Sequence, residues 1–282
     1  MLAKTGSGLM AGAARLLPGE HGGLMDSPKQ EMAALLMASR SDTGRLRQRN
    51  EDACLFDDAS RWAVLADGMG GYQGGDVASR LVVESLAGSL RASEATTVSQ
   101  MLAELRQATS RANTEVIAAA RKDRELHGMG STVVASRFHD NTLLVSHVGD
   151  SRMYRYRPDE LVQLTRDHSL LQEQVDGGMM SADAARVAPG RSLLTRALGV
   201  EPAVVPDVAL HEVRPGDVYL MCSDGLTDML EDADIALVCE TLSANLALAA
   251  DHLIQLANDR GGRDNITVVL IKVLQPFPAR RT

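Results

Sequence analysis

The sequence contains few of the residues that characterise secreted, membrane-spanning or nucleic-acid-binding proteins. Only three of its 282 residues are cysteine, and no two form a Cys-x-x-Cys pair, so neither a disulfide framework nor a zinc knuckle is expected. Aromatic residues make up 3% and the formal net charge is −8, which disfavours base stacking and binding to a phosphate backbone by bulk charge. No apolar run approaches the roughly 20 residues of a membrane-spanning helix. A soluble, cytoplasmic protein is therefore expected.

The N-terminal 40 residues differ in composition from the rest. Basic residues, but no acidic one, occur up to Gly19, with Gly, Ala and Ser between them. The apolar runs are short and no cleavage site follows a continuous hydrophobic block, so the pattern does not favour a signal peptide. We expect residues 1–40 to be a disordered extension or the result of an over-long start assignment. Residues 41–275 are expected to form a single domain and residues 276–282 a short tail.

Hydrophobic spacing predicts the secondary structure of this domain. Short apolar runs bounded by polar turns are typical of strands, and apolar residues every three or four positions are typical of helices. Because the strands come in blocks joined by short turns, an α+β fold with antiparallel sheets is favoured over a doubly wound parallel sheet. The expected strands are residues 55–56, 62–66, 131–138, 142–148, 152–156, 160–164, 217–222 and 266–273, and the expected helices are residues 77–86, 101–116 and 246–257.

Several aspartates stand at the ends of apolar runs, beside glycine or asparagine. Each such block alone is most simply a turn. Asp67 and Asp224 each follow an apolar run, Asp264 precedes one, and Asp150 closes another. Oxygen ligands that converge in this way suit a hard divalent cation such as Mg²⁺ or Mn²⁺. Because no His or Cys clusters with these blocks, a zinc site is disfavoured.

Glu51 and Asp52 form a further acidic pair. Adjacent side chains of an extended strand point to opposite faces, so these two are not expected to contact one ion directly together. We expect at least one of them to act through a metal-bound water.

Six motifs follow one another along residues 41–275. Together they resemble the metal-dependent protein phosphatases, the type 2C serine/threonine phosphatases, in their compact bacterial form. The motifs are Arg-Gln-Arg-Asn-Glu-Asp at 47–52, Ala-Asp-Gly-Met-Gly-Gly at 66–71, Gly-Ser-Thr at 130–132, Val-Gly-Asp-Ser-Arg at 148–152, Ser-Asp-Gly-Leu at 223–226 and Arg-Asp-Asn-Ile-Thr at 263–267. Residues 167–169 and 192–199 look like two further signatures of the family.

The resemblance implies an α-β-β-α sandwich, in which two antiparallel sheets pack face to face between helices, with a metal centre at one edge. It implies that Asp67 bridges two Mn²⁺ or Mg²⁺ ions and that the carbonyl of Gly68 ligates the second. Asp224 and Asp264 are implied to hold the first ion. Asp150 is implied, together with Asp224, to support a third, weaker ion.

The resemblance also implies a reaction. Arg47 matches the arginine that receives the substrate phosphate, and Glu51 and Asp52 match outer positions around the ions. The implied enzyme hydrolyses phosphoserine and phosphothreonine by direct attack of a hydroxide that bridges the two ions. Met69 stands where many eukaryotic members have histidine, and its thioether cannot donate a proton. We hypothesise that metal-bound water organised through Asp150 protonates the leaving group.

The implied partners are phosphoserine and phosphothreonine proteins and the serine/threonine kinase that modifies them. A catalytically weak binding module on the same scaffold is an alternative, although the metal aspartates Asp67, Asp224 and Asp264 are all present. A metal-dependent phosphodiesterase or nuclease is a third possibility, opposed by the negative charge and the scarce aromatics.

Two smaller features concern the surroundings of the predicted site. Residues 169–191 are either a flap beside the site or a plain connecting loop, and both interpretations stay open. His168 is better explained as a structural histidine bonded to nearby backbone than as a catalytic base, and His147, within an apolar strand, as a core residue.

Overall fold

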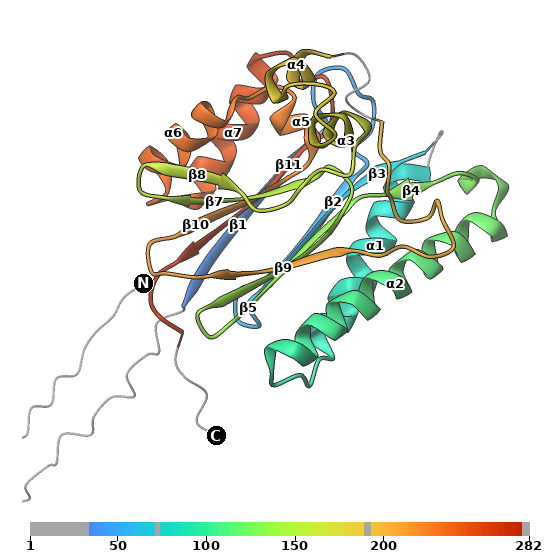
Figure 1. Ribbon diagram of the computed structural model, residues 1–282, viewed down its shortest axis with the longest axis horizontal. Coiled ribbons are helices and arrows are strands. Elements are labelled where there is room, and N and C mark those ends of the chain that lie inside the picture. The colour runs from blue at the N-terminus through green and yellow to red at the C-terminus, as the bar shows by residue number, and fades with distance from the viewer. Residues whose placement is uncertain (1–33, 71–73, 189–192, 278–282) are drawn as a thin grey trace, which may run out of the picture. The chain divides into compact units, whose positions relative to one another are not determined.

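Apolar runs that are buried on both faces form the strands of two antiparallel sheets (Figure 1). The computed structural model describes residues 34–70, 74–188 and 193–277. One sheet has the strand order β1-β11-β10-β7-β8, and the other has the order β2-β3-β5-β6-β9 with β4 paired to β3. The strands are β1 (Leu35–Asp42), β2 (Asp52–Asp57), β3 (Trp62–Met69), β4 (Gly130–Ser131), β5 (Val133–His139), β6 (Thr142–Val148), β7 (Arg152–Arg157), β8 (Glu160–Gln163), β9 (Asp207–Glu212), β10 (Val218–Cys222) and β11 (Ile266–Val273).

Helices cover the outer face of each sheet (Figure 1). Helices α1 and α2 pack on the six-stranded sheet, and α5, α6 and α7 pack on the five-stranded one. The α-helices are α1 (Gly74–Arg91), α2 (Val98–Lys122), α3 (Leu170–Asp176), α4 (Ala182–Val187), α5 (Asp224–Thr227), α6 (Asp232–Leu242) and α7 (Leu246–Asp259), and Arg124–Leu126 forms a 3₁₀ turn, η1. No helix in the described ranges is long and apolar enough to cross a bilayer.

Alternation along the central strands explains why the core has three layers. In β10, Leu220 faces the helices, whereas its neighbours Tyr219 and Met221 face the opposite sheet. In β3, Val64 likewise packs against α1 and α2, while Leu65 lies between the sheets. Because both faces of these strands are buried, their sequences are continuous apolar runs rather than alternating ones.

This architecture confirms the α+β fold and the α-β-β-α sandwich. Two expected boundaries were wrong. β1 begins at Leu35 and pairs with β11 along its whole length, so residues 35–40 belong to the sheet rather than to a disordered extension. Phe277, expected in a tail, is buried against Phe138. Residues 1–33 and 278–282 of the expected extension and tail lie outside the described residues.

The three cysteines behave as the sequence predicts. All are free thiols, and Cys222 in β10 and Cys239 in α6 are buried in the core between the five-stranded sheet and its helices. Burial raises the pKa of both thiols to about 12, so neither is a reactive thiolate at neutral pH.

Candidate metal centre

Four strand ends meet at one edge of the sandwich and bring the predicted aspartates together. Asp52 lies directly opposite Asp67 in the β2–β3 pair, so their side chains share one face of the sheet. Asp224 follows the end of β10, and Asp264 precedes the start of β11, which is the antiparallel neighbour of β10. We call the five carboxylates gathered here, including Asp150 from the β6–β7 turn, the carboxylate cluster. Its members are Asp52, Asp67, Asp150, Asp224 and Asp264.

Glycine permits one of the close approaches that this convergence requires. A Cβ atom on Gly225 would lie 2.0 Å from the carbonyl oxygen of Asn265, so a side chain there would push α5 away from the start of β11. The same Cβ would lie 3.3 Å from that of Asp264. Glycine after Asp224 therefore lets the segments that carry Asp224 and Asp264 touch.

Cations of the protein compensate the carboxylate cluster only in part, because Arg47 forms an ion pair with Asp264 while the other carboxylates raise one another's pKa. Burial, and then the charges of Asp52, Asp224, Asp150 and Asp264, raise the pKa of Asp67 well above its ordinary value. Burial and the nearby Asp150 and Asp264 do the same to the pKa of Asp224. Like charges this close cannot all ionise in a dry site unless a cation offsets them.

Two buried oxygen atoms in the cluster have no hydrogen-bond partner. They are Oδ1 of Asp52 and Oδ1 of Asp224. A buried carboxylate oxygen left without a partner costs free energy, and an all-oxygen donor set of this kind fits Mg²⁺ or Mn²⁺. The residues present thus fit the divalent ions that the sequence implied.

Asp52 and Glu51 contact different neighbours, as strand alternation predicts. The hydroxyl of Ser223 donates to Oδ2 of Asp52 at 2.7 Å, and burial raises the pKa of Asp52 to about 6. The Glu51 carboxylate instead abuts Gly75 in the first turn of α1. The backbone carbonyl of Glu51 accepts a hydrogen bond from the N–H of Gly68.

Arg47 lies at the edge of the cluster. Its Nη2 donates to Oδ2 of Asp264 at 2.6 Å, and its side chain is half exposed. The side-chain amide of Asn265 holds the loop between β1 and β2, which carries Arg47. Its nitrogen donates to the carbonyls of Thr43 and Arg49 in that loop, at 2.9 and 2.8 Å. This role of Asn265 could not be predicted from the sequence, since a side chain bonded to distant backbone leaves no local pattern.

A cavity of about 250 Å³ adjoins Asp150 and Asp224. Its walls come from β7, α3, α4 and the segment from α5 to the start of α6, and they include the acidic Asp228 and Asp232. Burial, and then the charge of Asp167, raise the pKa of Asp150 to about 7. The segment 169–191, for which a flap and a connecting loop were both left open, contains α3 and α4 beside this cavity, while residues 189–191 lie outside the described residues.

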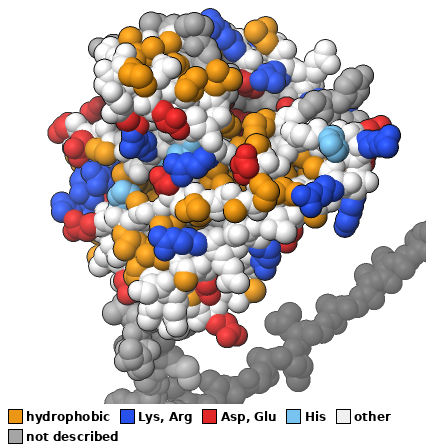
Figure 2. All heavy atoms as spheres, turned by 45° about the vertical axis from the view of Figure 1, so that its right-hand side comes forward, with side chains coloured by type: hydrophobic (Ala, Val, Ile, Leu, Met, Phe, Trp, Pro, Cys, Tyr) orange, Lys and Arg blue, Asp and Glu red, His pale blue; other side chains and the backbone are white. Residues whose placement is uncertain are grey.

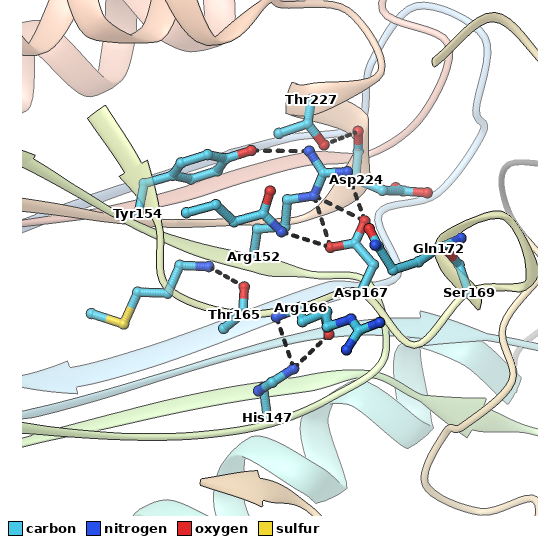
Figure 3. A network of polar contacts seen from close by, with 12 residues as sticks. His147, Arg152, Tyr154, Thr165, Arg166, Asp167, Ser169, Gln172, Asp224 and Thr227 are labelled. Carbon is cyan, nitrogen blue, oxygen red and sulfur yellow. Dashed lines mark hydrogen bonds and ion pairs between the residues drawn. The ribbon is translucent and has the colours of Figure 1, made fainter. Parts of the chain in front are cut away.

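His168 and His147 are structural, as the sequence predicted. The Nδ1 atom of His168 accepts a hydrogen bond from the backbone N–H of Gly149 at 3.1 Å. Nε2 of His147 lies 2.8 Å from the carbonyl oxygen of Arg166 (Figure 3). Burial lowers the pKa of His168 to about 4, so its ring is neutral at physiological pH.

Sequence reasoning missed the hydroxyls that hold Asp67. Thr132 Oγ1 accepts from the N–H of Asp67 at 3.0 Å and shares a 2.7 Å hydrogen bond with Ser151. Ser131 donates to the carbonyl of Asp67 at 3.0 Å. The Gly-Ser-Thr motif was visible in the sequence, but the strand pairing that turns its hydroxyls toward Asp67 was not.

A sandwich with a carboxylate cluster at one edge fits a metal-dependent hydrolase. Comparison with known proteins identifies the family. The family model described as protein phosphatase 2C matches residues 44–257, so the chain belongs to the protein phosphatase 2C family.

Individual relatives agree with this assignment. The chain is 41% identical over 242 residues to the serine/threonine protein phosphatase PstP of Mycobacterium tuberculosis, a match that covers 85% of this chain and 45% of PstP. It is 37% identical over 237 residues to the serine/threonine phosphatase stp of Listeria innocua, covering 83% of this chain and 94% of stp. The PstP catalytic domain in complex with two manganese ions superimposes with a TM-score of 0.77 at 38% identity, covering 86% of this chain and 99% of that one. The chain therefore spans less than half of PstP but nearly all of stp.

Proposed function

We propose that this protein is a metal-dependent serine/threonine phosphoprotein phosphatase, a phosphoric monoester hydrolase that uses two Mn²⁺ or Mg²⁺ ions. The observation that carries the proposal is the carboxylate cluster, in which the half-buried Asp67 and Asp224 form no ion pair with another described residue. The named activities of PstP and stp, and the manganese ions of the PstP structure, support the same assignment.

Each residue has a role in this proposal. Asp67, Asp224 and Asp264, with the carbonyl of Gly68, would hold the two principal ions, and Asp150 would contribute to a third. When bound, such ions lower the pKa of a water molecule and offset charge on the phosphoryl oxygens. Asp52 and Glu51 lie beside this donor set, on opposite sides of the backbone.

Arg47 is placed to bind the substrate phosphate. Its guanidinium is half exposed and extends over Asp264 at the rim of the cluster. A guanidinium can donate two parallel hydrogen bonds to phosphoryl oxygens, and it stays charged at any physiological pH. Positioning and electrostatic stabilisation of this kind dominate phosphoryl transfer, and no covalent intermediate is needed.

The face of the molecule shown in Figure 2 does not favour a nuclease. On the face shown in Figure 2, Lys and Arg side chains are interspersed with acidic ones and do not gather into a continuous basic patch. Affinity for a nucleic-acid backbone would require such a patch. We propose phosphoserine and phosphothreonine proteins as substrates, a serine/threonine kinase as the opposing enzyme, and, from the three free cysteines, a cytoplasmic location.

Hydrolysis of a phosphothreonine peptide in the presence and absence of Mn²⁺ tests the proposal. We expect phosphate release that depends on Mn²⁺ and is abolished by EDTA, with no activity in Asp67→Asn. A binding module would bind the peptide without releasing phosphate. A phosphodiesterase would hydrolyse bis(p-nitrophenyl) phosphate at least as fast as the phosphopeptide. Either of these results would overturn the assignment.

A further inference from the structure

The turn that carries Asp150 passes from one sheet to the other. β6 belongs to the six-stranded sheet and β7 to the five-stranded sheet, so residues 149–151 connect the two layers. Gly149 has φ +104°, and a Cβ there would lie 2.6 Å from a methyl carbon of Thr132. Residues 149–151 have no partner in either strand ladder. Contacts from outside the sheets must therefore fix the position of Asp150.

The adjacent residues Asp167 and His168 bond to both ends of this turn. The Asp167 carboxylate accepts from Nε of Arg152 at 2.9 and 3.0 Å and from its Nη2 at 2.6 Å (Figure 3). His168 forms two hydrogen bonds with Gly149. Its backbone N–H donates to the Gly149 carbonyl at 2.9 Å, and its ring atom Nδ1 accepts from the backbone N–H of Gly149. We call this set of contacts the Asp167–His168 clasp.

The hydrogen bonds also fix the tautomer of His168. Since Nδ1 is an acceptor, the neutral ring carries its hydrogen on Nε2, which points toward Oδ2 of Asp207 at 3.4 Å. The ring stacks on His147 with centroids 4.7 Å apart. His147, His168 and Asp207 have ligand atoms within 4.8 Å of one another, but Nε2 of His168 has no lone pair to offer a metal ion in this tautomer. The trio therefore supports the clasp rather than a second metal site.

The clasp also lies at the base of the segment that contains α3 and α4. The carbonyl of His168 accepts from the N–H of Thr195 at 2.9 Å, and the N–H of Leu170 donates to the carbonyl of Leu193 at 2.9 Å. These two hydrogen bonds form an isolated antiparallel β-bridge between Ser169 and Leu194. Both ends of the α3–α4 segment are thus joined beside the residue that holds the Asp150 turn.

We propose that Asp167 and His168 are positioning residues that hold Asp150 toward Asp224, and so tie the cation affinity contributed by Asp150 to the base of the α3–α4 segment. The inference rests on the proposed function and goes beyond it, because it assigns a role to two residues outside the carboxylate cluster. Loss of the clasp should weaken the cation-binding step that requires Asp150 and leave the other steps intact.

Two histidine substitutions separate positioning from general structure. The amide oxygen of Asn can take the place of Nδ1, so His168→Asn keeps an acceptor for the Gly149 N–H. The longer Gln places its amide near Nε2 instead, so His168→Gln loses that acceptor. A third variant, Asp167→Asn, removes the charge that holds Arg152. The matched control is Asp217→Asn, because Asp217 makes the same two-point pair with Arg157 at the other end of β7.

The readout is the Mn²⁺ affinity of each binding step, measured by calorimetric titration of the full chain without substrate. Asp150→Asn is the reference variant. We expect Asp150→Asn to lose the weakest binding step, and Asp167→Asn and His168→Gln to weaken that same step about tenfold, as loss of a charged or well-placed hydrogen bond does. His168→Asn and Asp217→Asn should titrate like the wild type. Hydrogen exchange of the Gly149–Ser151 amides should accelerate in Asp167→Asn and His168→Gln, and not in the other variants.

The outcomes distinguish this inference from the proposed function. If the wild type binds Mn²⁺ and hydrolyses phosphothreonine, but Asp167→Asn and His168→Gln titrate like Asp217→Asn, the clasp has no positioning role. If Asp150→Asn leaves the titration unchanged, or the clasp variants weaken all steps equally, the inference is also overturned. A wild type that binds no Mn²⁺ overturns both proposals.

Discussion

The aspartates at the two ends of strand β10 have different partners, and their pKa values shift in opposite directions. Asp217 precedes the strand, is 1% exposed, and is paired with Arg157 at 2.7 and 2.9 Å. The N–H of Arg214 and the hydroxyl of Tyr219 also donate to it. Burial would raise its pKa, but these donors outweigh burial and lower it. At the other end Asp224 is half-buried beside other carboxylates, and burial together with their charges raises its pKa.

We infer from this difference why Asp224, and not Asp217, would serve as a metal ligand. Both residues stand at a strand end beside apolar sequence, but Asp217 is buried and Asp224 is half-buried. Only Asp217 has the hydrogen bonds and the cation that a buried charge requires within the protein. At the carboxylate cluster the missing positive charge must come from outside the chain. The paired end therefore stabilises the fold, and the unpaired end is available for chemistry.

The largest expected effect comes from removing charge at the unpaired end. Asp67→Asn should reduce phosphopeptide hydrolysis by about 10³-fold or more, since it removes a carboxylate that we propose holds the two principal ions. The same change should raise the melting temperature of the metal-free protein by a few degrees, because it removes a like charge from the cluster. Activity assays and thermal unfolding in EDTA measure the two effects. A metal-free variant less stable than the wild type would contradict the account.

The corresponding change at the paired end should have the reverse pattern. Asp217→Asn leaves Arg157 partly buried without its counter-charge, and breaking a buried pair costs about 3–5 kcal/mol of unfolding free energy. The remaining folded protein should keep near wild-type kcat and Mn²⁺ dependence. Urea unfolding and initial-rate assays provide the measurements. A selective loss of Mn²⁺ affinity in this variant would remove the distinction between the two ends.

Arg47 forms an ion pair with Asp264 of the carboxylate cluster, and its side chain is half exposed, whereas that of Arg157 is partly buried. Arg47→Ala should raise KM for a phosphopeptide about 10–100-fold, the value of a charged hydrogen bond to phosphate. Mn²⁺ affinity should not fall, because Asp264 loses a competing cation. A weakened Mn²⁺ titration with unchanged KM would show that Arg47 serves the metal centre instead.

The pH dependence of stability should reveal the raised pKa values at the unpaired end. The pKa of Asp52 is raised to about 6 and that of Asp150 to about 7, from an ordinary value of 3.8. At pH values between 3.8 and these raised pKa values, the folded, metal-free protein binds more protons than the unfolded chain. Its unfolding free energy therefore falls as the pH rises through this range. The melting temperature in EDTA should therefore decrease from about pH 5 to about pH 8, and saturating Mn²⁺ should reduce that decrease. Asp150→Asn should flatten the metal-free profile, and an unchanged slope in that variant would count against the assignment.

Much of the fold was predictable because periodicity reports burial. The strands at 142–148 and 266–273 were expected with the bounds that the structure has, since each is a continuous apolar run with polar turns on both sides. β1 and β9 were missed. Exposed polar residues in both, such as Arg40 and Glu212, interrupt the pattern, and β1 gains its place through pairing with the distant β11.

For the site, sequence reasoning identified the aspartates but not what holds them. Asp67, Asp150, Asp224 and Asp264 stand out because each breaks an apolar run. Ser223 and Asn265 do not, since a small polar residue beside an aspartate is typical of any turn. Their roles depend on hydrogen bonds to Asp52 and to the backbone near Arg47, contacts that exist only after distant segments have packed.

Anomalous diffraction at the manganese edge, from crystals grown with Mn²⁺, is the most direct test of the carboxylate cluster. Two strong peaks should lie within bonding distance of the Asp67 carboxylate, one of them also beside Asp224 and Asp264. No peak at Asp67, or peaks only beside His147, His168 and Asp207, would contradict the assignment of this end of the sandwich as the metal centre.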